Sequence, residues 1–179
     1  MNQVLKLSTL TFLLTLSSAS YHAQAQEAVR SSDFARNSIF LELGGNGLLY
    51  SLNYDHKFFD HASARIGGMY LPLSADDPST FDGRISMIFV PIMANYLVGN
   101  GNSRLEIGGG VTVVRVDGGG TVENEQIDDF RGAGAVFTGT IGYRLQPRNG
   151  GFLFRIGFTP LFAPDGFLPW AGLSLGATF

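Results

Sequence analysis

The sequence predicts an all-β protein, an eight-stranded antiparallel up-and-down β-barrel that spans a membrane. First, eight segments alternate between apolar residues and small or polar ones, which is the side-chain period of a β-strand. Second, no apolar run after the amino-terminal segment approaches the length of about 20 residues that a membrane-spanning helix needs. Third, the 179 residues include 24 glycines and 15 phenylalanines. This pairing suits a wall with a crowded inner face and a bulky outer face.

The amino terminus predicts export. Lys6 precedes an apolar stretch over residues 7–16, and Ala23-Gln24-Ala25 fits the small-residue pattern of a signal-peptidase site. We therefore expect a signal peptide over residues 1–25, a polar leader over 26–37 and the barrel domain over 38–179. The chain has no cysteine, so backbone pairing and burial must hold the exported domain together. Its formal net charge of -3 argues against a nucleic-acid partner.

The eight strands follow one another with connections of alternating length. They are expected at residues 38–45, 48–58, 62–71, 84–98, 104–116, 132–145, 151–162 and 170–179. The connections at 59–61, 99–103 and 146–150 are short, whereas 72–83 and 117–131 read as long acidic loops and 163–169 as an intermediate one. Short turns at one end and longer loops at the other are typical of outer-membrane barrels. The long loops would then lie on the extracellular side, and both termini in the periplasm.

The first hairpin predicts its own register. Asn46-Gly47 is a strong signal for a two-residue type I′ turn, in which both residues take a positive φ. With this turn, Leu43 would face Tyr50 and Leu41 would face Leu52, while Glu42 would meet Ser51 on the other face. A slip of one residue would mix apolar and polar side chains, so the pattern favours a single pairing.

The later strands show the same alternation. Phe152, Phe154, Ile156 and Phe158 share one face of their segment, with Arg155 on the other. We assign the bulky face to lipid, because the interior of an eight-stranded barrel is only wide enough to be filled by side chains. The segment 84–98 is apolar on both faces and contains Pro91, which makes it the weakest of the strand predictions.

By parity, eight charged side chains point into the lumen. They are Glu42, Asp55, Lys57, Arg65, Arg104, Glu106, Arg144 and Arg155. Three acids and five bases suit an interior ion-pair network that satisfies buried charges and plugs the barrel. A selective pore is the functional alternative.

The last strand carries an alternating apolar pattern up to an aromatic residue. Leu173, Leu175, Ala177 and Phe179 share one face. The pattern resembles the carboxy-terminal signal that the outer-membrane insertion machinery recognises in its clients. That machinery is therefore an expected partner.

Three stretches resemble a known family. "LELGGNGLLYSLNYDHKF", "GYRLQPRNGGFLFRIGFTPLF" and "PWAGLSLGATF" look like the uncharacterised small outer-membrane β-barrel proteins of Bacteroidetes-type bacteria. The resemblance covers nearly all of the mature chain and implies an eight-stranded barrel of the OmpA/OmpX type in the outer membrane of a Gram-negative cell. It implies no activity.

These observations favour a structural or surface-interaction role, with outer-membrane lipid and lipopolysaccharide as partners and a monomeric barrel. A narrow, porin-like transport or permeability barrel, a lipid-modifying enzyme and a soluble lipid-binding barrel are the alternatives. His56 and His61 are the only histidines after the signal peptide, and we expect no catalytic, cofactor-binding or metal-binding residue set. Divalent cations at the acidic loops remain an open alternative, because hard cations prefer oxygen ligands.

Overall fold

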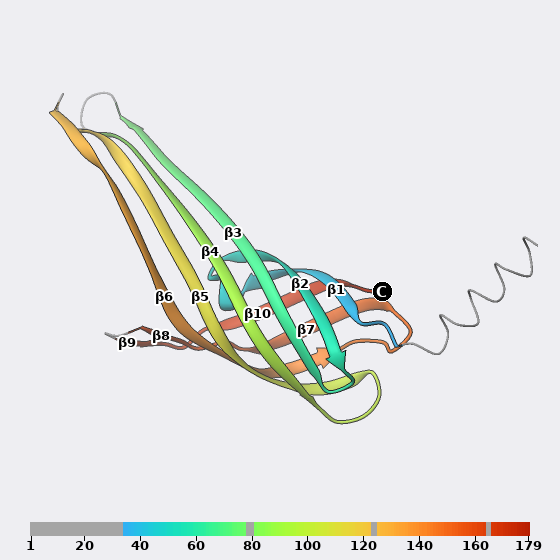
Figure 1. The fold of residues 1–179 in the computed structure, drawn as a ribbon. Coiled ribbons are helices and arrows are strands. Elements are labelled where there is room, and N and C mark those ends of the chain that lie inside the picture. Colours follow the sequence, from blue (N-terminus) through green and yellow to red (C-terminus); the bar gives the residue numbers. More distant parts are fainter. Residues whose placement is uncertain (1–33, 78–80, 123–124, 164–165) are drawn as a thin grey trace, which may run out of the picture. The chain divides into compact units, whose positions relative to one another are not determined.

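The computed structural model describes residues 34–77, 81–122, 125–163 and 166–179. The signal peptide expected at residues 1–25 and most of the leader lie outside the described residues. Within those residues, no helix is long and apolar enough to cross a membrane. Almost every described element is a β-strand (Figure 1).

The strands follow one another along the chain with a single short 3₁₀ turn, η1 (Gly45–Gly47), after the first. Their bounds are β1 (Asn37–Gly44), β2 (Tyr50–Phe59), β3 (Ala62–Asp77), β4 (Phe81–Val98), β5 (Ser103–Val122), β6 (Glu125–Leu145), β7 (Gly151–Phe158), β8 (Leu161–Ala163), β9 (Gly166–Leu168) and β10 (Ala171–Thr178).

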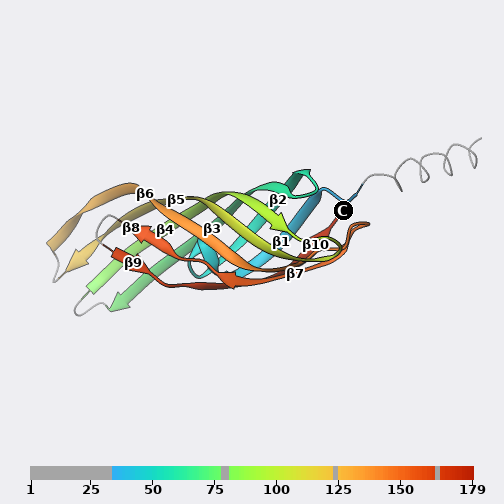
Figure 2. The same ribbon diagram turned by 90° about the horizontal axis from the view of Figure 1, so that it is seen from below.

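The sheet closes into a ring of eight antiparallel strands. β1 pairs with β2 on one side and with β10 on the other, and β10 continues through β7 to β6. Figure 2 shows β1, β10 and β7 lying side by side along the wall. At the seam, Leu41 faces Leu175, and the backbones of Asn37 and Phe179 exchange hydrogen bonds of 2.9 and 2.8 Å. The predicted eight-stranded up-and-down barrel is therefore confirmed.

Alternate side chains point to opposite sides of the wall. On β1, Leu41 is 48% exposed on the outer surface, whereas its neighbour Glu42 is 2% exposed inside. The same alternation runs through β2, where Tyr54 faces out and Asp55 faces in. The outer surface is therefore apolar and the interior is largely polar, the reverse of a water-soluble globule.

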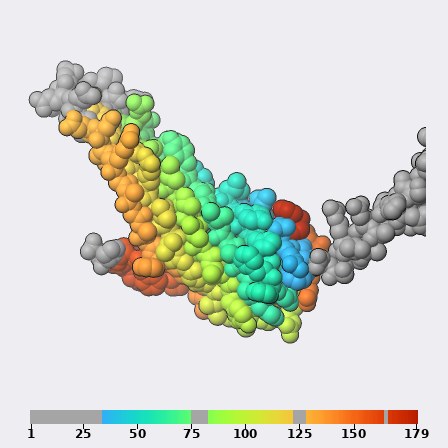
Figure 3. All heavy atoms as spheres, viewed as in Figure 1, coloured from blue at the N-terminus to red at the C-terminus, as the bar shows by residue number. Residues whose placement is uncertain are grey.

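Four strands extend far beyond the others. β3 to β6 span 16, 18, 20 and 21 residues, compared with 8 for β1. The long acidic loops predicted at 72–83 and 117–131 are wrong, because most of these residues pair in the continuing strands. Ser86 pairs with Asp117, for example, and Asp117 with Arg131. We call residues 69–77, 81–89, 114–122 and 125–136 the extension; it is the green-to-orange part that projects from the barrel in Figure 3.

The extension has two edges without strand partners among the described residues. β2 pairs with β3 only as far as Gly68, and β8 pairs with β6 only at Phe137 and Thr138. Residues 69–77 of β3 and 125–136 of β6 therefore form the borders of a four-stranded sheet.

Two prolines lie at breaks between successive strands. The strand predicted at 151–162 is less continuous than expected, because Thr159 and Pro160 separate β7 from β8. The strand predicted at 170–179 is continuous as β10, and the connection predicted at 163–169 contains the short strand β9, which Pro169 separates from β10. Pro91 is different: it lies inside β4, which is a strand as predicted, and the ladder to β3 lapses only beside it. Proline has no N–H to donate, so it removes one ladder hydrogen bond without changing the register.

Candidate functional site

The turn after β1 folds into the barrel instead of standing out from it. The type I′ turn predicted at Asn46-Gly47 is wrong: the positive φ angles belong to Gly44, Gly45 and Leu48, at 69°, 71° and 76°. The turn is a 3₁₀ segment closed by a 3.2 Å hydrogen bond from the Leu48 N–H to the Gly45 carbonyl. The predicted register below it is right, with Leu43 facing Tyr50 and Leu41 facing Leu52.

Asn46 anchors this turn to the opposite wall. Its side-chain amide donates to Thr138 Oγ1 at 2.6 Å and to the Gly139 carbonyl at 2.9 Å. Its side-chain oxygen accepts hydrogen bonds from Thr140, at 3.1 Å, and from Arg65. Asn46 is fully buried, and its bonds to Thr138, Thr140 and Arg65 are made away from water. The sequence indicated a turn here but gave no sign that the turn would enter the lumen.

The backbone of the turn is fixed at two further points. Thr112 Oγ1 donates to the Asn46 carbonyl at 2.8 Å, and Trp170 Nε1 donates to the Leu48 carbonyl at 2.8 Å. Strands β3, β5 and β6 and the segment before β10 therefore all hold the turn. It lies across the lumen at the end where the extension begins.

Below the turn, six charged side chains form one chain of ion pairs that alternates in sign. In order, they are Arg65, Glu42, Arg155, Glu106, Arg144 and Asp55. The closest N–O distance of each pair lies between 2.6 and 3.7 Å, and every side chain is at most 5% exposed. Each carboxylate therefore has a guanidinium partner in a space that excludes most water.

Phe40 contributes to the same cluster from an inward position on β1. Its ring lies 4.7 Å from the Arg155 guanidinium carbon and 5.9 Å from that of Arg65. An aromatic face stabilises a cation through its quadrupole. The alternation of β1 placed Phe40 on the polar face, and that was the only signal in the sequence for this contact.

The other two charged side chains assigned to the lumen, Arg104 and Lys57, lie toward the end with the short turns. Arg104 pairs at 3.0 Å with Asp60, a turn residue that the sequence did not single out. Lys57 is 1% exposed and lies within the electrostatic reach of Asp55 and Asp60. Burial opposes ionisation of Asp60, but the hydrogen bond and charge of Arg104, with Arg148 and Lys57, outweigh it and lower the pKa of Asp60. Asp60 is therefore a carboxylate at neutral pH.

Little space remains inside the wall. A cavity beside Glu42, Glu106 and Arg155 has a volume of about 10 Å³, which is room for about one water molecule. The lumen is filled by its own side chains at this level.

Among the described residues, the histidines and the acidic side chains form no further cluster. His56 Nδ1 lies 2.8 Å from Asn37 Oδ1 and its ring packs edge-on against Phe58, while His61 Nδ1 lies 2.8 Å from the Leu97 carbonyl. Across the described part of the chain, no three His, Cys, Asp or Glu side chains are grouped closely enough to hold a metal ion.

No protein-family model and no curated protein matches the chain. Solved structures do match. Ail, the attachment invasion locus protein of Yersinia pestis, aligns over 82% of this chain and 99% of its own at 12% identity, with a TM-score of 0.51. Ail in complex with the heparin analogue sucrose octasulfate aligns over 80% of this chain and 98% of its own at 12% identity, with a TM-score of 0.57. The N-terminal β-barrel domain of Pseudomonas aeruginosa OprF aligns over 80% of this chain and 96% of its own at 14% identity, with a TM-score of 0.52. The chain thus has the fold of the eight-stranded transmembrane β-barrels of the outer membrane.

Proposed function

We propose that the chain is an integral protein of the bacterial outer membrane, that its barrel is closed to solutes, and that it acts structurally or by surface interaction. The extension would stand on the extracellular side, and the short turns and both ends of the described barrel would lie in the periplasm. The outer-membrane barrel fold and the apolar outer surface support this placement.

The outer surface fits lipid better than water. Phe137 is 70% exposed, Leu52 62% and Ile92 46%, and they lie on three different strands of the wall. Soluble monomers rarely expose a continuous apolar patch larger than a few hundred Å². A belt of this kind around the whole ring is the pattern of a wall that contacts acyl chains. Outer-membrane lipid and lipopolysaccharide are therefore the proposed partners of the wall.

The filled lumen is the single observation that carries the closed state. An ion or solute passing through the barrel would have to displace Asn46 and then separate ion pairs such as Arg144 with Asp55, at 2.6 Å. Breaking a buried pair leaves an uncompensated charge, which costs several kcal/mol. The chain of ion pairs therefore acts as a plug.

The first test places the barrel in the membrane. Cells that express the protein are fractionated, and the membrane fraction is run on a gel with and without boiling in detergent. We expect the protein in the outer-membrane fraction with a mobility that shifts on boiling. Recovery in the soluble fraction without a shift would contradict the proposal.

The second test separates a plugged barrel from a transport barrel. Purified protein is inserted into a planar lipid bilayer, and the current is recorded across a range of voltages. We expect no stable unit conductance. Regular conductance steps would instead support a narrow permeability barrel.

The outward residues of β10 and the adjoining terminus support recognition by the insertion machinery. Leu173, Leu175, Ala177 and Phe179 are all on the outer face, and Phe179 is 59% exposed. We expect Phe179→Ala to reduce the amount of heat-modifiable protein in the outer membrane. Phe137→Ala removes another aromatic ring from the same outer surface, one that is 70% exposed, and serves as the control. Equal losses in the two variants would contradict a specific signal.

An enzymatic role would need His56 or His61 to act together with a nucleophile and an acid. We expect His56→Ala to leave the lipid composition of the outer membrane unchanged. A change in acyl or headgroup pattern would revive the lipid-modifying alternative.

A further inference from the structure

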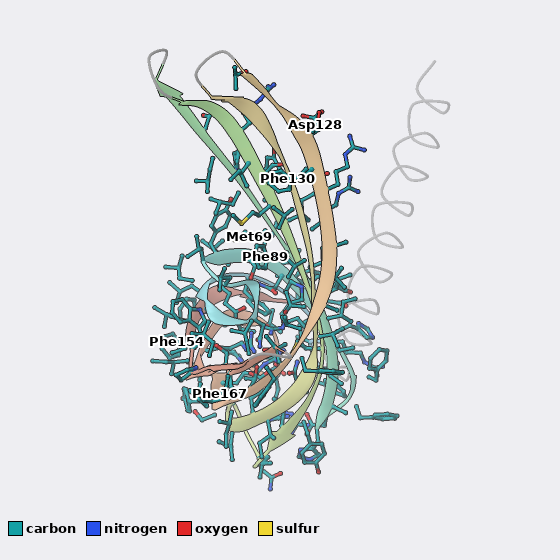
Figure 4. The ribbon with its side chains drawn as sticks, turned by 90° about the vertical axis from the view of Figure 1, so that its left-hand side faces the viewer. Met69, Phe89, Asp128, Phe130, Phe154 and Phe167 are labelled. Atoms are coloured by element: carbon teal, nitrogen blue, oxygen red, sulfur yellow. The ribbon has the colours of Figure 1, made fainter. Side chains whose placement is uncertain are left out.

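The extension carries a polar cavity of about 590 Å³. Its lining comes from all four strands, and its charged members are Arg84, Asp117, Asp129 and Arg131. Arg84 is the cross-strand partner of Gly119, and Asp117 is the partner of Arg131, so these positions share one face of the sheet. Figure 4 shows the side chains along this sheet, with Asp128 and Phe130 of β6 labelled.

That face is continuous with the lipid-facing surface of the barrel. Val113 lies four residues before Asp117 on β5 and is 41% exposed, and Ile88 on β4 is 38% exposed. Ile88 is the cross-strand partner of Arg115, so the first charged residue on the outer face of β5 lies directly beside the last apolar residues. Tyr70, 55% exposed, both belongs to this apolar border and lines the cavity. The cavity thus begins where the apolar band ends.

The floor of the cavity is Gly119, and a carboxylate lies over it. A side chain at Gly119 would collide with Asp129 Oδ1, which shows that this oxygen occupies the space above the glycine. Asp117 is held by Arg115 Nε at 2.8 Å and Nη2 at 3.2 Å, and by Arg131 Nε at 3.4 Å. These contacts orient the guanidinium of Arg131 at the rim of the cavity and keep Asp117 ionised.

Arg84 and Arg131 stand on opposite sides of this floor. They belong to β4 and β6, two strand spacings apart, which is about 10 Å. An arginine carries five N–H donors, so an ion pair through Nε leaves its terminal amino groups for another acceptor. A guanidinium matches the geometry of a phosphate through two parallel hydrogen bonds. Asp117 and Asp129, which can only accept, suit the hydroxyl groups of a sugar.

We propose that this cavity binds the phosphate-bearing sugar headgroup of lipopolysaccharide, with Arg84 and Arg131 at a phosphate and the acyl chains along Tyr70, Ile88 and Val113. The apolar border directly below the cavity favours an amphiphile over a soluble saccharide. The inference rests on the proposed location in the outer membrane, because only there would such a glycolipid lie at this height on the wall.

The test measures lipopolysaccharide binding by folded, purified protein in a neutral detergent. The protein is labelled, and thermophoresis follows its titration with lipopolysaccharide and with the same material after its phosphates have been removed. We expect dephosphorylation to weaken binding about tenfold or more, because charge-assisted hydrogen bonds to phosphate are lost.

Variants locate the binding. The double variant Arg84→Gln with Arg131→Gln should weaken binding of intact lipopolysaccharide about tenfold or more, whereas Arg84→Lys with Arg131→Lys should recover part of the loss. Arg148→Gln makes the same kind of substitution, with the loss of one charge, at the opposite end of the barrel, where Arg148 pairs with Asp60, and should bind like the wild type.

Several results would overturn the proposal. They are equal binding of intact and dephosphorylated lipopolysaccharide, no loss in the double glutamine variant, and an equal loss in Arg148→Gln. Binding of a soluble sulfated saccharide at the same arginines, without binding of lipopolysaccharide, would assign the cavity to another ligand. The boiling shift verifies that each variant is folded. If the double variant does not fold, the comparison of intact with dephosphorylated lipopolysaccharide still tests the proposal. A folded barrel in the outer membrane that fails to bind would refute this site alone and leave the proposed function standing.

Discussion

Replacing Arg144 with methionine tests whether the ion pairs hold the barrel together. Arg144 has no exposed surface and lies between two carboxylates, 2.6 Å from Asp55 and 3.3 Å from Glu106. Methionine has an unbranched side chain that partly fills the same space and carries no charge. The substitution removes the guanidinium partner of Asp55, which keeps a 2.9 Å hydrogen bond from Ser63 and the nearby charge of Lys57, whereas Glu106 keeps Arg155 at 2.7 Å.

The expected loss follows from the buried carboxylate of Asp55, which loses its guanidinium partner. Removing one partner of a buried ion pair costs about 3–5 kcal/mol, because the other charge stays in a place that water does not reach. Adding Asp55→Asn removes that charge, so the double variant should cost about 2 kcal/mol less than the sum of the two single variants. The control is Arg148→Met, because the pair of Arg148 with Asp60 is 3.4 Å long and half-exposed and is worth less than about 1 kcal/mol.

Equilibrium unfolding in urea, with the barrel in lipid vesicles, measures these differences. Trp170 is the only tryptophan in the chain and reports unfolding by its fluorescence. A loss below about 1 kcal/mol for Arg144→Met, or a loss equal to that of the control, would show that the lumen screens its charges as bulk water does. The reasoning from burial would then be refuted.

Three further perturbations test other parts of the barrel. Asn46→Ala should lower the free energy of unfolding by about 3 kcal/mol, since it leaves buried donors and acceptors unpaired, as measured by the same urea titration. Asp60→Asn should flatten the acid limb of stability against pH. The pKa of Asp60 is lowered in the folded state by Arg104, so its contribution is present above the unfolded value of about 3.9 and lost as the pH falls through the folded pKa. Gly110→Ala should abolish the boiling shift, because its methyl group would overlap the Ile92 carbonyl, whereas Gly109→Ala meets nothing within 4 Å and should fold normally.

Each of these perturbations has a result that would contradict it. For Asn46, the comparison is Asn149→Ala in an exposed turn, and equal stability of the two variants would show that the η1 turn adds nothing. For Asp60, an unchanged difference between variant and wild type from pH 7 down to about pH 3 would mean that its pKa is not lowered on folding. For the two glycines, equal folding of both alanine variants would show that the wall has room on its inner side.

The features that the sequence predicted well depend on side-chain alternation. The register of β1 with β2 follows from it, because a slip by one residue would place Leu41 and Leu43 in the lumen and Glu42 in lipid. The strand character of 84–98 was harder to see, because Phe89 and Met93 are buried inside although both are apolar. Parity gives the direction of a side chain, not its polarity.

The features that the sequence predicted poorly depend on contacts between distant strands. Gly118 to Gly120 and the aspartates near them have the composition of a loop, yet the ladders of β4 and β6 on either side hold them in β5. Asn46-Gly47 has the local chemistry of an exposed turn, but hydrogen bonds to Thr138 and Thr140 hold Asn46 inside the barrel. Local propensity cannot register a partner 92 residues away.

The inward turn also implies an order in which the strands of the barrel assemble. The β1–β2 hairpin is a local pairing that could form early, but Asn46 in its η1 turn bonds to Thr112 and Thr138, which are 66 and 92 residues away. Those bonds exist only after β5 and β6 have curved around to face the hairpin, and contacts of such sequence separation form slowly. The first hairpin of the chain is therefore completed last, and the lumen stays open during folding until the wall has closed.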